Sequence, residues 1–66
     1  MKNTIKVERA KLNITQEDLA NEIGVSRQTI NSIEIGKYVP STLLALKLAK
    51  FFKIKADDIF TLEKGD

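Results

Sequence analysis

Cysteine and histidine are both absent from this 66-residue chain. Without cysteine there are no disulfides and no thiolate metal sites, and without either residue the usual zinc and nucleophile–base chemistries lack their side chains. A chain this short holds a single domain, residues 1–66, and offers little cleft for a substrate. We therefore expect no enzyme activity, no metal site, no cofactor and no small-molecule ligand.

Long apolar runs are also missing. No stretch approaches the roughly 20 residues of a membrane span, and the apolar segment of a signal peptide does not follow the first residues, Met1–Thr4. We expect a cytoplasmic protein with no membrane partner. The net charge of +2 is mildly basic. This favours polyanionic partners but does not by itself separate a DNA-binding protein from an ordinary basic domain.

Glycine and proline are scarce, and they divide the chain into helical segments. Capping residues and apolar spacing predict helices that begin after Thr4, Thr15, Ser26, Ser41 and Lys55. We expect an all-α fold of five helices, in which the two chain ends, both compatible with strand structure, could pair as a small terminal β-ribbon. The expected helices span about 5–12, 16–23, 27–35, 42–53 and 56–60.

The second and third predicted helices lie very close together in the sequence. Thr15 and Asp18 have the spacing of a capping box, Gly24 stands where the second helix should end, and Ser26 is placed to cap the third. The segment 24–26 leaves room for a three-residue turn, the length that joins the two helices of a helix-turn-helix. We therefore predict a helix-turn-helix at about residues 16–35.

The outward face of the third helix carries side chains suited to DNA. Arg pairs in a bidentate way with guanine, whereas Gln and Asn pair with adenine, in the major groove. We therefore predict that Arg27, Gln28, Asn31 and Ser32 read base edges. The same polar face would also suit an ordinary solvated helix surface, and the residues alone do not decide between the two interpretations.

Other polar residues are candidates for contacts with the DNA backbone. Helix starts offer free N–H groups and the positive end of a dipole, which suit phosphate. These contacts would fix the register without selecting a sequence. The predicted phosphate-contacting residues are Gln16, Ser26, Thr29, Lys37 and Tyr38.

The fourth predicted helix is apolar over most of its circumference. A surface helix needs only one apolar stripe, so the surplus indicates that another subunit covers a second side, as in a homodimer. Its lysines, Lys47, Lys50 and Lys53, fit a solvated face. Glu34, on the third helix, is expected to pair with a nearby basic side chain such as Arg9.

The chain resembles the Xre/Cro family of phage lambda-repressor-like helix-turn-helix domains from about Val7 to Phe60, and it is similar to the short stand-alone regulators of the cytolysin-repressor type. The matching residues are Thr15-Gln16, Leu19-Ala20, Ile23-Gly24-Val25-Ser26, Ile30, Ile33-Glu34, Gly36-Lys37, Pro40-Ser41, Leu48-Ala49 and Asp57-Asp58-Ile59.

This resemblance implies a lambda-repressor-like fold and a homodimeric transcriptional regulator of double-stranded DNA. It also implies phosphate contacts from Gln16, Ser26 and the residues near Lys37, and base contacts from the positions of Arg27, Gln28, Asn31 and Ser32. A homodimer would bind an inverted-repeat operator and, with no room for an effector domain, would repress by occupying a promoter. The alternative is an antitoxin or another protein-interaction module that uses the same fold.

Overall fold

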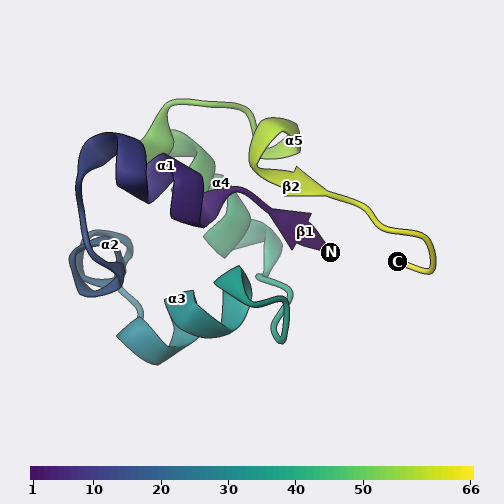
Figure 1. Cartoon of the computed structure of the whole chain (residues 1–66), viewed down its shortest axis with the longest axis horizontal. Coiled ribbons are helices and arrows are strands. Elements are labelled where there is room, and N and C mark those ends of the chain that lie inside the picture. The colour runs from purple at the N-terminus through teal and green to yellow at the C-terminus, as the bar shows by residue number, and fades with distance from the viewer.

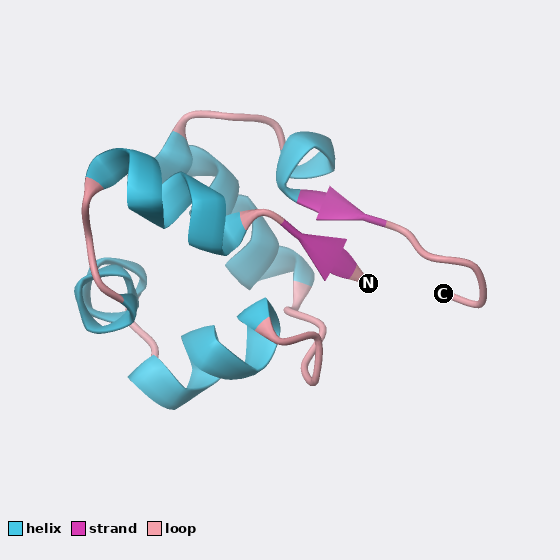
Figure 2. Ribbon diagram, in the orientation of Figure 1, coloured by secondary structure: helices cyan, strands magenta, loops and turns pink.

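The computed structural model describes all 66 residues and contains five helices and one two-stranded sheet, as Figures 1 and 2 show. This architecture confirms the expected five-helix fold and the terminal ribbon. In chain order the elements are β1 (Lys2–Asn3), α1 (Ile5–Leu12), α2 (Gln16–Ile23), α3 (Arg27–Glu34), α4 (Thr42–Phe52), α5 (Ala56–Ile59) and β2 (Phe60–Thr61).

A single apolar core holds the helices together. All five helices contribute at least one fully buried apolar side chain, and no polar side chain is fully buried. Because α3 contributes only two of these residues, its other sides are free to face solvent. The core residues are Ile5, Leu19, Ala20, Ile23, Ile30, Ile33, Leu44, Leu48 and Ile59.

Side-chain caps fix the starts of the three central helices. The Thr15 hydroxyl accepts from the Asp18 N–H at 3.0 Å, and the Asp18 carboxylate accepts from the Thr15 N–H at 3.0 Å. Ser26 and Ser41 cap α3 and α4 through bonds from the N–H groups three residues later. These three predicted caps are confirmed.

The predicted cap of the first helix is wrong. Thr4 makes no side-chain cap; its hydroxyl lies 3.5 Å from the Asp58 carbonyl oxygen instead. The Asn3 side chain takes the capping role, because its Oδ1 accepts from the Ile5 N–H at 3.2 Å while its Nδ2 donates to the Ile33 carbonyl oxygen at 2.8 Å. Asn3 therefore ties the start of α1 to the end of α3.

The chain ends meet in an antiparallel ribbon, in which Lys2 pairs with Thr61 and Asn3 with Phe60. The fifth helix therefore ends at Ile59, one residue before the predicted end, because Phe60 has extended backbone angles and belongs to the strand. Figure 1 shows the two ends running side by side, on the opposite side of the molecule from α2. The Met1 ammonium group forms ion pairs of 3.2 Å with both Glu63 and Asp66.

Candidate nucleic-acid interface

The turn between α2 and α3 sets the angle at which α3 leaves the core. Gly24 adopts a left-handed φ of 89°, a conformation that glycine reaches without the steric cost of a Cβ atom. The N–H groups of Gly24 and Val25 both donate to the Ala20 carbonyl oxygen, at 2.8 and 3.0 Å. These bonds close α2, and Ser26 starts α3 two residues after the glycine. The predicted helix-turn-helix is thus present in the fold.

The predicted base-reading residues face away from the core. Arg27, Gln28 and Asn31 are exposed and together line one surface recess, and Ser32 is half-buried beside them. On the other side of the same helix, Ile30 and Ile33 are buried. Hence the structure places the outward face of α3 where the sequence predicts it, on a helix held from behind by packed side chains.

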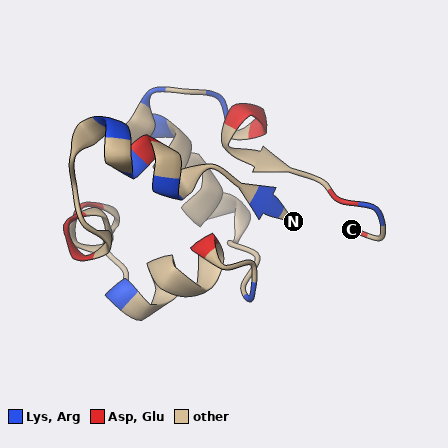
Figure 3. Ribbon diagram, in the orientation of Figure 1, with Lys and Arg blue, Asp and Glu red and all other residues tan.

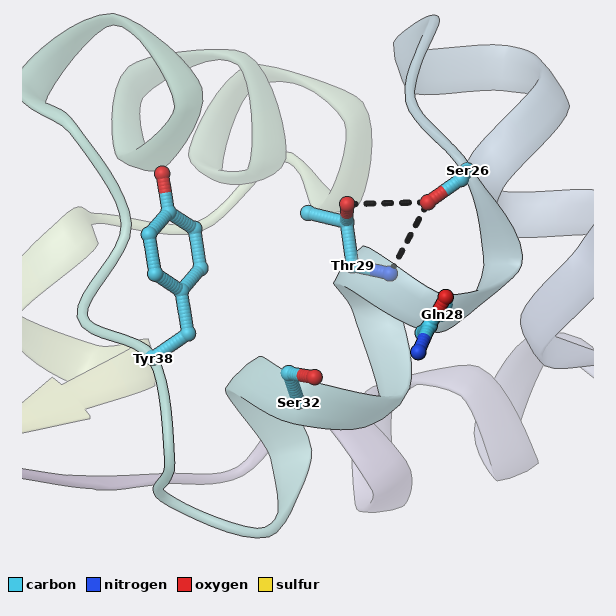
Figure 4. Close-up of a pocket in the computed structure, with 5 residues that line it drawn as sticks. All are labelled: Ser26, Gln28, Thr29, Ser32 and Tyr38. Atoms are coloured by element: carbon cyan, nitrogen blue, oxygen red, sulfur yellow. Dashed lines mark hydrogen bonds between the residues drawn. The ribbon is translucent and has the colours of Figure 1, made fainter.

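Four of the predicted contact residues meet Tyr38 around a second recess beside α3. Figure 4 shows Tyr38 on one side of this recess and Ser26 and Thr29 on the other, with Gln28 and Ser32 completing the lining. The Ser26 and Thr29 hydroxyl oxygens lie 2.9 Å apart, and the Ser26 Oγ also accepts from the Thr29 N–H at 3.1 Å. The recess therefore carries several hydroxyl groups, which suit a phosphate or sugar oxygen.

The loop after α3 folds back on the end of that helix. The N–H groups of Lys37 and Tyr38 both donate to the Ser32 carbonyl oxygen, at 2.9 and 3.2 Å. Both side chains remain exposed. This anchoring keeps an ammonium and a phenol group next to the C-terminal end of the candidate reading helix.

Gln16 lies differently from the other predicted phosphate contacts. Its Nε2 donates to the Asn31 Oδ1 at 3.1 Å and to the Glu34 Oε1 at 3.2 Å, so the amide nitrogen already serves two acceptors of α3. The sequence analysis does not predict this contact. Gln16 and Asn31 lie 15 residues apart, and no sequence pattern shows that their side chains meet. Gln16 consequently links α2 to the reading face of α3.

An ion pair removes the only acidic group of α3 from the surface. The Arg9 Nε and Nη2 donate to the two oxygens of Glu34, at 2.7 and 3.0 Å, which confirms the predicted pairing. The side chain of Glu34 is only 6% exposed, and its hydrogen bonds raise the pKa of Arg9. Arg27, the first residue of α3, is then the exposed charged residue of this helix, and Figure 3 shows a basic position at the start of α3. The exposed face of α3 therefore has no unpaired negative charge to repel DNA.

Two residues from the N-terminal half of α4 also adjoin the candidate interface. Leu43 and Lys47 line a recess together with Val25, Thr29 and Tyr38, so the first turns of α4 adjoin the hydroxyl-lined recess of α3. Leu43 is 65% exposed there. Ser41, which caps the start of α4, lines the same recess.

Known proteins match this chain over nearly its whole length. The helix-turn-helix family model matches residues 5–59, which include both helices, the turn and every residue of the candidate interface. The chain belongs to this helix-turn-helix family. It is therefore a member of the Xre and lambda-repressor-like group of DNA-binding transcriptional regulators, and the resemblance seen in the sequence is confirmed.

Similar proteins in two other organisms are named HTH-type transcriptional regulators. An HTH-type transcriptional regulator of Methanocaldococcus jannaschii is 62% identical over 66 residues, with all of both chains covered. Another from Bacillus subtilis is 52% identical over 64 residues, or 97% of each chain. Among solved structures, the SOS-response transcriptional repressor LexA from Eubacterium rectale matches with a TM-score of 0.80 and 32% identity over 94% of this chain. The present chain spans 66% of that solved chain.

No helix combines the length and the apolar character needed to cross a membrane. The acidic side chains do not gather in a group of three or more that could hold a metal ion.

Proposed function

We propose that the protein is a cytoplasmic, nucleoid-associated repressor that binds an inverted-repeat operator in double-stranded DNA as a homodimer. The observation that carries this proposal is the outward face of α3. Its exposed side chains, Arg27, Gln28 and Asn31, belong to a helix whose opposite side is locked by Ile30 and Ile33. Side chains on a rigid, capped helix can enter the major groove without first being ordered, which lowers the entropic cost of binding.

In this proposal Arg27 pairs with guanine through both of its terminal nitrogens, and Gln28 contacts adenine. Asn31 and Ser32 lie further along the same face and contact the next base edges. The N-terminal end of α3 also adds the positive end of a helix dipole. Each good bidentate contact of this kind discriminates between bases by about 1–3 kcal/mol.

Phosphate contacts would hold the helix in register from both sides. Ser26, Thr29 and Tyr38 offer hydroxyl groups around one recess, and Lys37 adds a positive charge after α3. Gln16 would contact phosphate through its backbone N–H at the start of α2, because its side-chain nitrogen is engaged within the protein. These contacts position the protein, whereas the residues of α3 select the sequence.

Exposed apolar side chains support a homodimer. Leu46 on α4 is 57% exposed and Val39 in the preceding loop is 59% exposed. We expect Leu46→Lys to convert a dimer to a monomer in sedimentation velocity, because it would place a charge in an apolar contact between subunits. Leu12→Lys is the matched control, since Leu12 is 51% exposed on α1 and its substitution should leave the dimer intact. A dimer that survives Leu46→Lys would remove this face from the interface.

Selection of bound duplexes from a random-sequence DNA pool tests the function directly. The proposal predicts an enriched inverted repeat whose half-site centres are about 34 Å, or one helical turn, apart, since each subunit inserts one α3. Enrichment of a single half-site would contradict the dimer on DNA. A pool that stays random after repeated selection would overturn the proposal that the protein reads sequence.

A further inference from the structure

The terminal β-ribbon lies against the end of the candidate reading helix. The side chain of Asn3, in β1, donates from its Nδ2 to the Ile33 carbonyl oxygen at 2.8 Å, although the two residues are 30 positions apart. The turn after α3 also passes close to the ribbon, because a Cβ atom on Gly36 would lie 4.0 Å from the carbonyl oxygen of Met1, the residue before β1. Figure 1 shows β1 and this turn on the same side of the molecule. The ribbon therefore adjoins both α3 and the loop that follows it.

Backbone groups on both sides fix the orientation of the Asn3 amide group. The Ile5 N–H can only donate, and it bonds to the Asn3 Oδ1 at 3.2 Å, whereas the Ile33 carbonyl oxygen can only accept, and it bonds to Nδ2. The reverse orientation would bring two donors together at Ile5 and two acceptors together at Ile33. The backbone of Asn3 is held as well, because it pairs with Phe60 in the ribbon. Asn3 is thus a link of defined geometry between the ribbon and α3.

This link holds the last turn of α3, from which the loop 36–38 continues. The last four carbonyl groups of a helix have no partner within the helix, and helix ends fray. Here the Ser32 carbonyl oxygen accepts from two N–H groups of the loop, and the Ile33 carbonyl oxygen accepts from the Gly36 N–H at 3.0 Å and from Asn3. Asn3 is the only partner of these carbonyl oxygens that comes from outside α3 and its loop. It therefore anchors this helix end to the rest of the fold.

The loop carries two of the residues that the proposed function assigns to phosphate. Tyr38 forms one side of the hydroxyl-lined recess, and Lys37 is exposed beside it in the sequence. We propose that the terminal ribbon supports this loop and that Asn3 is a positioning residue for the phosphate contacts of Lys37 and Tyr38. A loop that is already held in place loses less conformational freedom when it binds. This inference rests on the proposed function, since it concerns contacts that the function assigns to DNA.

The substitution Asn3→Ser removes the link to α3 and keeps the cap of α1. Serine is a favoured capping residue, so its hydroxyl can still accept from the Ile5 N–H, but it has no second arm to reach the Ile33 carbonyl oxygen. The net charge of the protein is unchanged. Thr4→Val is the matched control, because Thr4 is the next residue and its hydroxyl lies near the Asp58 carbonyl oxygen, not near α3.

Amide hydrogen exchange of the free protein, measured by NMR, tests whether the link supports the loop. In Asn3→Ser we expect the N–H groups of Lys37 and Tyr38 to exchange about fivefold faster, the factor that corresponds to one ordinary hydrogen bond. The N–H group of the buried Leu48 should keep its rate. Thr4→Val should leave the exchange of the loop unchanged, because that substitution does not touch the end of α3.

A double-mutant cycle on DNA binding tests whether Asn3 acts through this loop. Asn3→Ser should weaken binding to the selected site and to random DNA alike, and should reduce the slope of log affinity against log salt by about one unit, as expected when a phosphate contact is lost. In the Lys37→Ala/Tyr38→Phe background the same substitution should change affinity by less than about twofold, because the contacts that it misplaces are already absent. Circular dichroism verifies that every variant is folded. General destabilisation would weaken binding equally in both backgrounds.

The outcomes separate this inference from the proposed function. Unchanged exchange of the loop in Asn3→Ser, or equal losses of DNA affinity in the two backgrounds, would overturn the positioning role and leave DNA reading by α3 in place. Loop exchange that accelerates as much in Thr4→Val would also overturn it. A random-sequence pool that yields no motif would instead overturn the proposed function, whereas exchange in the free protein would still show whether Asn3 holds the loop.

Discussion

Helices α3 and α4 bury their inner sides in the same way but expose different chemistry. Each contributes two buried apolar residues to the core, Ile30 and Ile33 from α3, and Leu44 and Leu48 from α4. Outward, α3 carries neutral hydrogen-bonding side chains with one arginine at its start, whereas α4 carries leucines and lysines. Both helices have a serine cap. The helix framework is therefore common to the two, and the difference lies on their exposed faces.

This comparison separates the determinants of the fold from those of function. Buried apolar contacts are non-directional and specify only that a helix packs. Hydrogen-bonding side chains of α3, by contrast, are directional, and the bond from Gln16 to Asn31 holds one of them in a single orientation. An exposed face that the protein itself keeps oriented is better suited to recognition than one formed by flexible lysines such as Lys50 and Lys53.

Substitutions on the buried sides of α3 and α4 should have the largest effect, on the free energy of unfolding. Ile30→Ala and Leu48→Ala should each lower the free energy of unfolding by about 2–5 kcal/mol, because each leaves a cavity at a fully buried position. Urea unfolding monitored by circular dichroism measures both. Gln28→Ala, on the exposed face, is the control and should change stability by less than about 0.5 kcal/mol. A control as destabilising as the core variants would mean that the outward face supports the fold.

Substitutions on the exposed faces of α3 and α4 should have the next largest effect, on DNA affinity. Gln28→Ala should weaken binding to the selected DNA site by about 1–3 kcal/mol and leave binding to random DNA nearly unchanged, since only base contacts distinguish the two. Lys50→Ala, on α4, should change both affinities by the same small amount. Fluorescence anisotropy at one fixed salt concentration supplies all four values. Equal losses on both DNAs for Gln28→Ala would contradict base reading.

A smaller effect is expected on the salt dependence of DNA binding, which distinguishes lysines that contact phosphate from lysines that only face solvent. Lys37→Ala should reduce the slope of log affinity against log salt by about one unit, because one fewer counterion is released on binding. Lys53→Ala should leave that slope unchanged, since Lys53 directly follows α4 and lines a recess formed by the end of α4, the next loop and α5. The salt dependence on random-sequence DNA is sufficient for the measurement. An unchanged slope in Lys37→Ala would remove this residue from the phosphate contacts.

The smallest effect concerns the caps. Backbone and side-chain hydrogen bonds from Thr15 lower the pKa of Asp18, so its capping contribution is present above the unfolded value of about 3.9 and is lost as pH falls through the lower folded value. Asp18→Asn should therefore reduce thermal stability at pH 7 more than at pH 3. Ser26→Ala should cost a similar amount at both pH values, about 0.5–2 kcal/mol, because a serine cap does not titrate. Equal effects of Asp18→Asn at both pH values would contradict the cap.

Much of the fold follows from local sequence signals, and the exceptions depend on contacts between distant residues. Thr15, Ser26 and Ser41 are identified as caps because their bonds close over three residues. Thr4 does not cap because the ribbon holds Asn3 in position to do so, and that ribbon joins residues at opposite ends of the chain. The end of α5 shifts for the same reason.

In the candidate interface, too, some features follow from local sequence signals and others depend on contacts between distant residues. The outward placement of Arg27, Gln28 and Asn31 follows from the periodicity of α3 alone, and the structure reproduces it. The contact between Gln16 and Asn31 depends on the angle between α2 and α3, which the sequence pattern does not contain. The sequence analysis predicts a basic partner such as Arg9 for Glu34, and the structure confirms this pair. Side-chain orientation at the site therefore required the three-dimensional structure.

The central claim is that the outward side chains of α3 contact base edges, and two-dimensional NMR of their side-chain nitrogen groups tests it most directly. Addition of the selected duplex should shift the NH₂ signals of Gln28 and Asn31 and the Arg27 Nε–H signal, whereas a scrambled duplex of equal length and salt should leave them nearly unchanged. The NH₂ signals of Asn3, which is bonded within the fold, provide an internal reference. Side-chain signals of α3 that stay in place while only lysine signals of α4 shift would contradict the claim.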